Sequence, residues 1–357
     1  MLVACIYWNT VKNKDELSFY QAAELIQKLA KNQPLHKFLL LTNKVILNNL
    51  NWNSNVQIIQ IESNGKLAKK LLEVIQFKKQ IQLFQPQIII HCNEIIPFKN
   101  SIPQILYFHL QSTKKEKSKC FNIQKIIVNH LHSKEQLIDD FEVEENKIEI
   151  LHLPPSSGFK PLPLQETSII KDSYADSREY FLYIITSENN EQFITVLKAF
   201  SQFKKWQKSS MKLIVVSRFT QLSNINKEKL DSYKFKEDVV IVEQPNDEQY
   251  AKILASAYAT IYLSQNCNLN LPWFEILQTH QPLITSDLNE IKEIARDAAL
   301  FVNDNNVDDV AAQMQSIYKD ENLRSKLINK AKSIAEAHLQ SNSIDKFWQI
   351  IQKAVQV

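Results

Sequence analysis

The chain has 357 residues, a formal net charge of +3, 44% hydrophobic residues and 23% charged residues. These values are typical of a globular protein with room for two domains, and the small charge does not indicate a nucleic-acid partner. No apolar run reaches the ~18 to 20 residues that a membrane-spanning helix requires. The four cysteines have no paired spacing, which favours reduced thiols in a cytoplasmic protein and gives no zinc motif.

Glycine is unusually rare. The sequence contains only Gly65 and Gly158, where ordinary usage predicts roughly 25. Glycine lets a backbone close tightly around a phosphate. A chain with only two glycines therefore cannot contain a glycine-rich phosphate-binding loop.

Short apolar runs alternate with helical patterns throughout the first half. The apolar N-terminal segment is too short for a signal peptide and reads as a first strand. In the helical segment from Gly65 to Gln82 we expect Leu67, Leu71, Val74 and Ile75 to face the core and five lysines to face solvent. The predicted strands are 3–7, 38–42, 56–61, 87–91, 105–108, 125–129 and 147–152.

A proline-rich break at 153–166 separates this half from a second alternating half. Phe193, Val196, Leu197, Phe200 and Phe203 share one helix face. Asn246 and Gln249 predict a capping box. Residues from Val307 onward read as helices. The predicted strands are 180–186, 212–217, 239–243, 260–264, 282–286 and 299–302.

This alternation predicts an α/β protein with two Rossmann-like, doubly wound domains of parallel strands. We expect an N-terminal domain over 1–157, a second domain over 158–340, and a C-terminal helix over 341–357 that packs back on the first. Ligands of such sheets bind beyond the carboxyl ends of the strands, so a cleft between the domains is the expected site.

The second domain resembles the donor domain of GT-B-fold retaining glycosyltransferases of the group 1, family 4-like type. The resemblance runs from about Glu179 to His338. It rests on Ala257-Tyr258-Ala259 before Ser264, on Pro282-Leu-Ile-Thr-Ser-Asp287 before Glu293-Ile294, and on Asp297-Ala-Ala-Leu300. The first domain matches more loosely, through Ile102-Pro103 and Phe108-His109. The resemblance implies a GT-B fold and sugar transfer from a nucleotide-diphosphate sugar, without a metal or other cofactor.

The family motif E-x-F-G-L-P-x-x-E aligns with Cys267-Asn-Leu-Asn270-Leu271-Pro272-Trp-Phe-Glu275. Leu271, Pro272 and Glu275 are retained. The resemblance implies that Glu275 accepts hydrogen bonds from the ribose and that amides near Asn270 and Leu271 meet the diphosphate at a helix start. A plain stabilising acid in the first helical turn is the alternative for Glu275.

Other motif residues are lost. Cys267 replaces the glutamate near the donor sugar, and a neutral thiol cannot stabilise developing positive charge. The positions of the diphosphate-binding glycine and cation hold Ile185 and Glu191. Arg218 is a candidate replacement cation, with a solvated surface arginine as the alternative. Ser264 is expected to line the cleft.

His109 follows an apolar strand and is the candidate catalytic residue, able to bond a sugar hydroxyl or donate a proton. A merely structural histidine is the alternative. Paired histidines and cysteines elsewhere lack a third ligand, so we predict no metal site. Two groups of lysines in the first domain are candidates for contact with an anionic membrane, or simply solvated. They are Lys66, Lys69, Lys70, Lys78 and Lys79, and Lys114, Lys115, Lys117 and Lys119.

The sequence therefore predicts a cytoplasmic glycosyltransferase, with peripheral contact at the inner face of the membrane as an option. Its expected partners are a nucleotide-diphosphate sugar and a glycan or lipid-linked acceptor, with no nucleic acid. A catalytically inactive relative, acting as a partner or glycan-binding subunit, is the main alternative, because several motif residues are replaced. A sugar-nucleotide epimerase of the same fold is a third hypothesis.

Overall fold

The structure, a computed structural model, describes residues 1–8, 16–43, 52–61, 69–96, 101–107, 123–152, 158–186, 191–218, 221–264, 271–339 and 342–356. The chain forms two compact units. The first unit is Met1–Leu153 with Asn342–Val357, and the second unit is Pro154–Ser341. Within the described ranges, every helix is too short or too polar to span a bilayer.

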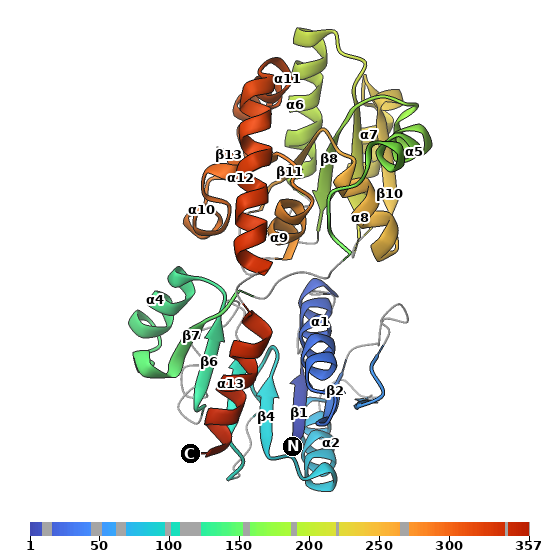
Figure 1. The fold of residues 1–357 in the computed structure, drawn as a ribbon. Coiled ribbons are helices and arrows are strands. Elements are labelled where there is room, and N and C mark those ends of the chain that lie inside the picture. The colour runs from blue at the N-terminus through green and yellow to red at the C-terminus, as the bar shows by residue number, and fades with distance from the viewer. Residues whose placement is uncertain are drawn as a thin grey trace. The chain divides into compact units, whose positions relative to one another are not determined.

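The first unit is built on a seven-stranded parallel sheet in the order β3-β2-β1-β4-β5-β6-β7 (Figure 1). Its strands are β1 (Leu2–Tyr7), β2 (Lys37–Thr42), β3 (Val56–Gln60), β4 (Ile88–His91), β5 (Gln104–Tyr107), β6 (Lys125–Val128) and β7 (Ile148–Ile150). Its helices are α1 (Glu16–Asn32), α2 (Lys69–Phe84), α4 (Leu131–Asp139) and α13 (Ser343–Gln356), with a 3₁₀ turn, η2, at Glu145–Lys147.

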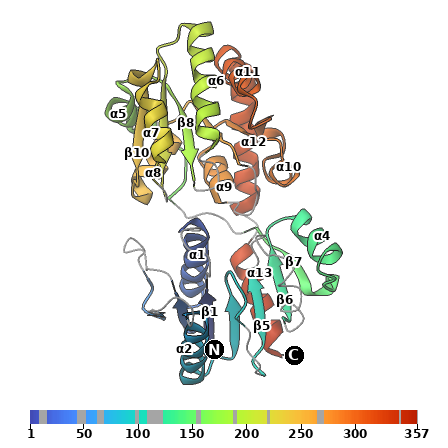
Figure 2. The ribbon, with the colours of Figure 1, turned by 180° about the vertical axis from the view of Figure 1, so that it is seen from behind.

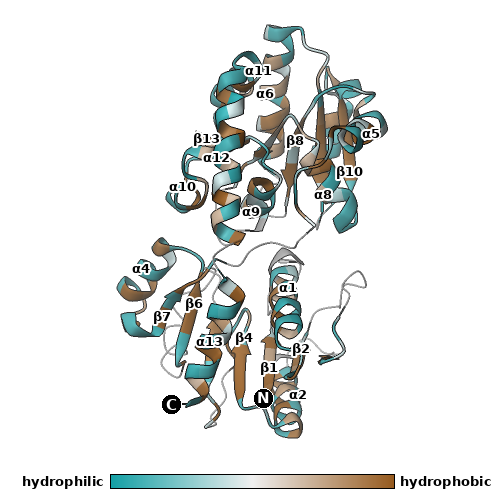
Figure 3. Ribbon diagram, in the orientation of Figure 1, coloured by the Kyte–Doolittle hydropathy of each residue, from teal (hydrophilic) through white to brown (hydrophobic). Residues whose placement is uncertain are grey.

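Alternating side chains of the strands divide the core of the first unit between the two faces of its sheet. In β1, Val3 and Cys5 pack with residues of α1 and α13, whereas Ala4 and Ile6 pack with Phe77 of α2. Because both faces are covered, the strands are apolar along their whole length. Figure 3 shows the strands mostly in brown and the helices with teal on their outer sides.

Helix α2 buries a different face from the one predicted. Leu71 and Ile75 are 65% and 52% exposed, whereas Phe77, Ile81 and the carboxylate of Glu73 face inward. The expectation that Leu71 and Ile75 face the core is therefore wrong, Val74 is half-buried, and Leu67 lies outside the described residues. The helix has apolar side chains on more than one face, so periodicity alone does not select the buried one.

Helix α13 completes the core of the first unit although it follows the whole second unit in the chain. Phe347, Trp348 and Ile351 are buried among residues of α1, β4 and β5. Asn32 at the end of α1 donates to Asp345 across 2.9 Å. Figures 1 and 2 show α13 lying beside the strands of the first unit.

The second unit contains a six-stranded parallel sheet in the order β10-β9-β8-β11-β12-β13. Its strands are β8 (Tyr180–Ile185), β9 (Lys212–Ser217), β10 (Val239–Glu243), β11 (Ala259–Tyr262), β12 (Leu283–Ser286) and β13 (Ala299–Val302). Its helices are α5 (Leu164–Ala175), α6 (Gln192–Gln207), α7 (Asn224–Asp231), α8 (Asp247–Ala255), α9 (Leu271–Gln278), α10 (Asn289–Ala295), α11 (Val307–Lys319) and α12 (Glu321–Leu339), with 3₁₀ turns η3 (Lys236–Asp238) and η4 (Arg296–Ala298).

The two faces of the second sheet are covered by different helices. Tyr180 and Leu182 of β8 pack with α8 and α9, and Phe181 and Tyr183 pack with α6 and α11. The predicted apolar face of α6 is buried as expected. All thirteen predicted strands are found with ends within two residues of the prediction. Both units are thus doubly wound parallel α/β domains, which confirms the predicted fold class.

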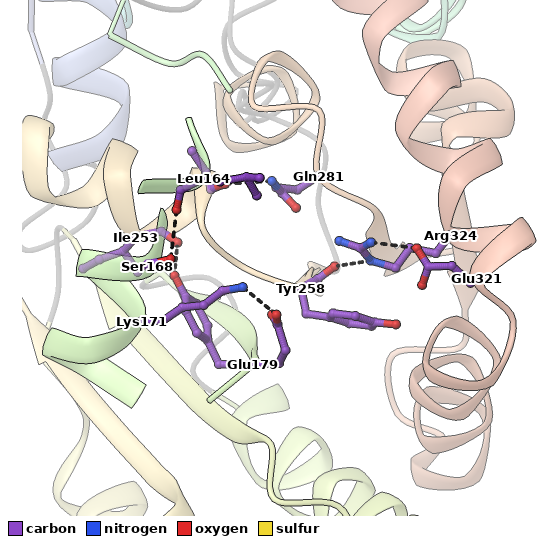
Figure 4. A network of polar contacts seen from close by, with 11 residues as sticks. Leu164, Ser168, Lys171, Glu179, Ile253, Tyr258, Gln281, Glu321 and Arg324 are labelled. Carbon is purple, nitrogen blue, oxygen red and sulfur yellow. Dashed lines mark hydrogen bonds and ion pairs between the residues drawn. The ribbon is translucent and has the colours of Figure 1, made fainter. Parts of the chain in front are cut away.

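The amino-terminal edge of the second sheet is fastened by polar contacts (Figure 4). Arg324 of α12 donates to the carbonyl of Tyr258 and stacks 4.3 Å above the Tyr258 ring. Lys171 of α5 pairs with Glu179, just before β8. These contacts hold α5 and α12 at the amino-terminal edge of the sheet. Ligands of such sheets bind at the opposite, carboxyl-terminal edge.

Candidate functional site

Three segments of the second unit carry polar side chains to the carboxyl-terminal edge of its sheet. Arg218 directly follows β9, Asp247 opens α8, and Glu275 lies in α9. The strand order reverses between β8 and β11, which is where doubly wound sheets bind ligands. The predicted capping box fixes the start of α8. The side chain of Asn246 accepts from the backbone N–H of Gln249 at 2.9 Å, and the side chain of Gln249 accepts from the backbone N–H of Asn246 at 3.1 Å.

The guanidinium of Arg218 connects two carboxylates. Its Nη1 lies 2.7 Å from Oε1 of Glu275, and its Nη2 lies 2.7 Å from Oδ1 of Asp247. The side chains of Arg218 and Glu275 are 4% and 1% exposed, whereas Asp247 is 46% exposed. The pair therefore lies in the interior, and Asp247 covers it at the surface.

Two aromatic rings lie close to the guanidinium of this ion pair. The Arg218 guanidinium lies 4.7 Å from the centre of the Tyr250 ring and 5.9 Å from that of Phe159. Burial, together with the negative charge of Glu275, holds the pKa of Tyr250 well above its ordinary value. The Tyr250 hydroxyl therefore stays protonated and donates to Glu275. Glu275 is thus held by one charged and one neutral donor.

This geometry changes the interpretation of Arg218. The alternative of a solvated surface arginine is wrong, because the side chain is buried and paired. Two carboxylates already offset its charge, so it holds Glu275 in place more readily than it attracts a diphosphate. Its assignment to the donor site stays a prediction. Sequence reasoning missed Asp247 and Tyr250, although the capping box at Asn246 places both on the first turn of α8.

The other predicted site residues lie apart from this ion pair or outside the described residues. Ser264 follows β11, is buried, and donates its backbone amide to Oγ of Ser286 across 2.9 Å. It lines a separate cavity between β11, β12 and β13. Leu271 is the first residue of α9. His109, Cys267 and Asn270 lie outside the described residues, so their predicted roles remain predictions.

The two positions that a diphosphate-binding glycine and cation would occupy lie at the end of β8 and before α6. Ile185 is buried as the last residue of β8, and Glu191 is exposed immediately before α6. Among the described residues, no group of three or more His, Cys, Asp or Glu side chains is arranged to hold a metal ion.

Part of the second unit matches a known sequence family. Residues 165–334 match the Glycosyl transferases group 1 family. This match covers just under half of the chain and includes Arg218, Asp247, Tyr250 and Glu275. Over 173 residues the chain is 22% identical to the O-antigen chain mannosyltransferase RfbU of Salmonella typhimurium, which is 48% of this chain and 44% of that protein. The alignment thus spans less than half the length of this relative.

Solved structures match over nearly the whole chain. Sucrose-phosphate synthase from Thermosynechococcus elongatus has a TM-score of 0.80 at 14% identity, covering 99% of this chain and 98% of that chain. WaaG, a glycosyltransferase involved in lipopolysaccharide biosynthesis, has a TM-score of 0.75 at 10% identity, covering 98% and 99%. HepE of Anabaena in complex with UDP and glucose has a TM-score of 0.75 at 9% identity, covering 99% of both chains. At these identities the likeness shows the fold, and the chain has the GT-B fold.

Proposed function

We propose that the protein is a retaining, metal-independent glycosyltransferase that moves a sugar from a nucleotide-diphosphate sugar to a glycan or lipid-linked acceptor. The observation that carries this proposal is Glu275, retained on α9 at the carboxyl-terminal edge of the sheet, within the stretch that matches the group 1 family. The likeness to HepE, which was solved with UDP and with UDP-glucose, supports the choice of these compounds as first probes.

In this proposal, Glu275 accepts hydrogen bonds from the ribose hydroxyls. An ionised carboxylate offers about four lone-pair sites, so Glu275 can accept from several donors at once. The Glu275 side chain is only 1% exposed. Donor binding therefore requires Arg218 to give up part of its contact with Glu275 and Asp247 to move away from the pair.

The remaining roles follow the motif. Amides at Asn270 and Leu271 would meet the diphosphate at the start of α9, where the helix dipole favours negative charge. Cys267 and Ser264 would lie near the donor sugar. His109, from the first domain, would bond a sugar hydroxyl or donate a proton at the reacting centre.

Titration calorimetry with UDP, GDP, UDP-glucose and GDP-mannose tests this proposal. We expect one nucleotide to bind and Glu275→Gln to weaken its binding. The matched control is Glu248→Gln on α8, an exposed glutamate that pairs with Lys252, and it should leave the affinity unchanged. Binding without sugar transfer to any acceptor would favour the inactive relative. No binding by any nucleotide would contradict both the transferase and the epimerase hypotheses.

We propose further that the first unit contacts an anionic membrane at its cytoplasmic face through α2. Leu71, Ile75, Lys78 and Lys79 are exposed on this helix, and its one acidic residue, Glu73, is buried. An apolar and basic surface without acids suits a bilayer with anionic headgroups. Lys66 and the lysines at 114–119 lie outside the described residues.

Sedimentation with vesicles of phosphatidylcholine and phosphatidylglycerol tests this contact. Lys78→Glu with Lys79→Glu should release the protein from anionic vesicles, whereas Lys205→Glu on α6 should not. Equal binding by these variants, or no binding by the unaltered protein, would exclude α2 as a membrane contact.

A further inference from the structure

A polar cavity of about 510 Å³ opens at the carboxyl ends of β11, β12 and β13 in the second unit. Its volume falls in the range of roughly 300–1,000 Å³ that small-molecule sites occupy. It shares no residue with the Arg218–Glu275 pair. Ser264 connects the two sites in sequence, because it lines the cavity and comes shortly before α9.

The wall of this cavity is rich in hydrogen-bond acceptors. Asp287, Asp304 and Asp309 contribute carboxylates, and Asn303 contributes an amide. Some of these groups also hold the wall together, since Asp309 accepts from the Asn303 backbone amide at 2.8 Å.

Asp304 is the residue of this wall that has a buried acceptor without a partner. Gln192, the first residue of α6, is 2% exposed, and its side chain hydrogen-bonds to Asp304. Within the described part of the chain, neither Oε1 of Gln192 nor Oδ2 of Asp304 has a hydrogen-bond partner, although both atoms are buried. Burial also raises the pKa of the Asp304 carboxyl. A buried acceptor without a partner is costly, so a hydroxyl group that donates to the Asp304 carboxylate would stabilise this wall.

The charge of the cavity limits the class of ligand further. Lys292 pairs with Asp287 and offsets one of the three carboxylates, so the wall remains negative. A phosphate, a carboxylate or a diphosphate would be repelled there. The cavity therefore does not suit the diphosphate of a donor, and it does suit hydroxyl groups, which donate strong hydrogen bonds to carboxylates.

One part of the wall is apolar. Phe301 of β13, together with Leu288 and Val302, contributes hydrocarbon surface to the cavity. A sugar ring presents both hydroxyl groups and carbon–hydrogen faces, so it can use the carboxylates and the aromatic ring at the same time.

We propose that this cavity binds an uncharged, hydroxyl-bearing sugar ring and rejects sugars that carry a carboxylate or a phosphate. A role for this cavity in sugar transfer rests on the proposed function, because the cavity would then select the class of sugar that the enzyme transfers. Binding of a sugar to the cavity can be measured without a nucleotide.

Saturation-transfer NMR with methyl glucoside and with glucuronate tests this inference on the full chain. The unaltered protein should bind methyl glucoside at least about tenfold more tightly than glucuronate, which corresponds to one unfavourable charge contact. Asp304→Asn should reduce this preference, because it removes charge and nearly keeps shape. Asp308→Asn is the matched control, since Asp308 is exposed on the next helix and does not line the cavity.

Phe301→Leu provides a second, uncharged variant in case Asp304→Asn does not fold. It should weaken methyl glucoside binding and leave the discrimination against glucuronate in place. Absence of methyl glucoside binding, equal binding of the two sugars, or an unchanged preference in Asp304→Asn would overturn the inference. Nucleotide titration separates the two proposals. If the sugar binds but no nucleotide does, the proposed donor site is wrong and the cavity assignment stands. If a nucleotide binds but the sugar does not, the cavity assignment is wrong and the donor site stands.

Discussion

The guanidinium of Arg218 donates to the carboxylate of Glu275 across 2.7 Å, between the end of β9 and the first turns of α9. The two residues are 57 positions apart in sequence and are both buried. This ion pair holds the retained motif glutamate in one orientation, so it connects the stability of the second unit to its proposed donor site.

Removing one member of this pair should destabilise the second unit strongly. Arg218→Met leaves the Glu275 carboxylate buried without its charged partner, and we expect a loss of about 3–5 kcal/mol in the free energy of unfolding. Urea denaturation measures this loss. The double variant Arg218→Met with Glu275→Leu should recover much of it, because no charge then remains buried. A double variant no more stable than Arg218→Met would contradict this account.

The stability of the first unit should depend on pH through His91. Burial lowers the pKa of His91 from its ordinary value of 6.5 to about 4, against the opposing effect of its 2.8 Å contact with Gln104. The unfolded chain therefore binds a proton between pH 6.5 and pH 4 that the folded chain does not. The contribution of neutral His91 to the free energy of unfolding is fully present above pH 6.5. It is lost as the pH falls toward 4, and the total loss is up to about 3 kcal/mol.

Comparing the unaltered protein with His91→Gln isolates this effect from the titration of carboxylates. The variant should lose less stability than the unaltered protein between pH 7 and pH 4.5, measured by urea denaturation at each pH. Parallel pH profiles for the two proteins would show that His91 is not responsible.

The contact between Trp8 and Glu73 should contribute to the first unit. Nε1 of Trp8 donates to the buried Glu73 carboxylate across 2.8 Å. Trp8→Phe keeps an aromatic ring but removes this donor, which should cost about 1–3 kcal/mol. Trp206→Phe, at an exposed tryptophan on α6, is the matched control and should be near neutral. Equal stability losses in the two variants would argue against a specific role for the hydrogen bond.

Helix α13 should act on the first unit alone. Phe347 is buried in the core shared with α1 and β5, and Phe347→Ala should cost about 3–5 kcal/mol. Scanning calorimetry should show one of two unfolding transitions shifted to lower temperature, with the other unchanged. Leu339→Ala, at an exposed position near the end of α12, should shift neither. A shift of both transitions by Phe347→Ala would mean that the units do not unfold independently.

The strands were the most predictable part of the molecule. Runs such as 212–217 and 299–302 are short, apolar and bounded by turn residues, and these are local properties. The capping box at Asn246 and Gln249 is equally local, and the structure confirms it. The buried face of α2 was not predictable in this way, because Leu71 and Ile75 are as apolar as Phe77 and Ile81. The choice depends on tertiary contacts, including the hydrogen bond from Trp8 to Glu73.

The candidate site was predictable only in part. Leu271, Pro272 and Glu275 follow a contiguous pattern, so their place at a helix start could be inferred from the sequence. The partner of Glu275 could not, because Arg218 and Tyr250 reach it from other segments. The acceptor-rich cavity likewise depends on three strand ends meeting. Of its residues only Ser264 was predicted to line a site, although Ser286 and Asp287 belong to a segment that carries the family resemblance.

The position of α13 has a consequence for how the protein is made. A ribosome releases β1 to β7 long before α13, since the whole of the second unit is synthesised between them. Until then, Tyr107 and its neighbours lack the cover that Phe347 supplies. The nascent first unit therefore exposes an apolar sheet face during translation, and a fragment ending at Leu153 should aggregate unless a peptide with the sequence of α13 is supplied.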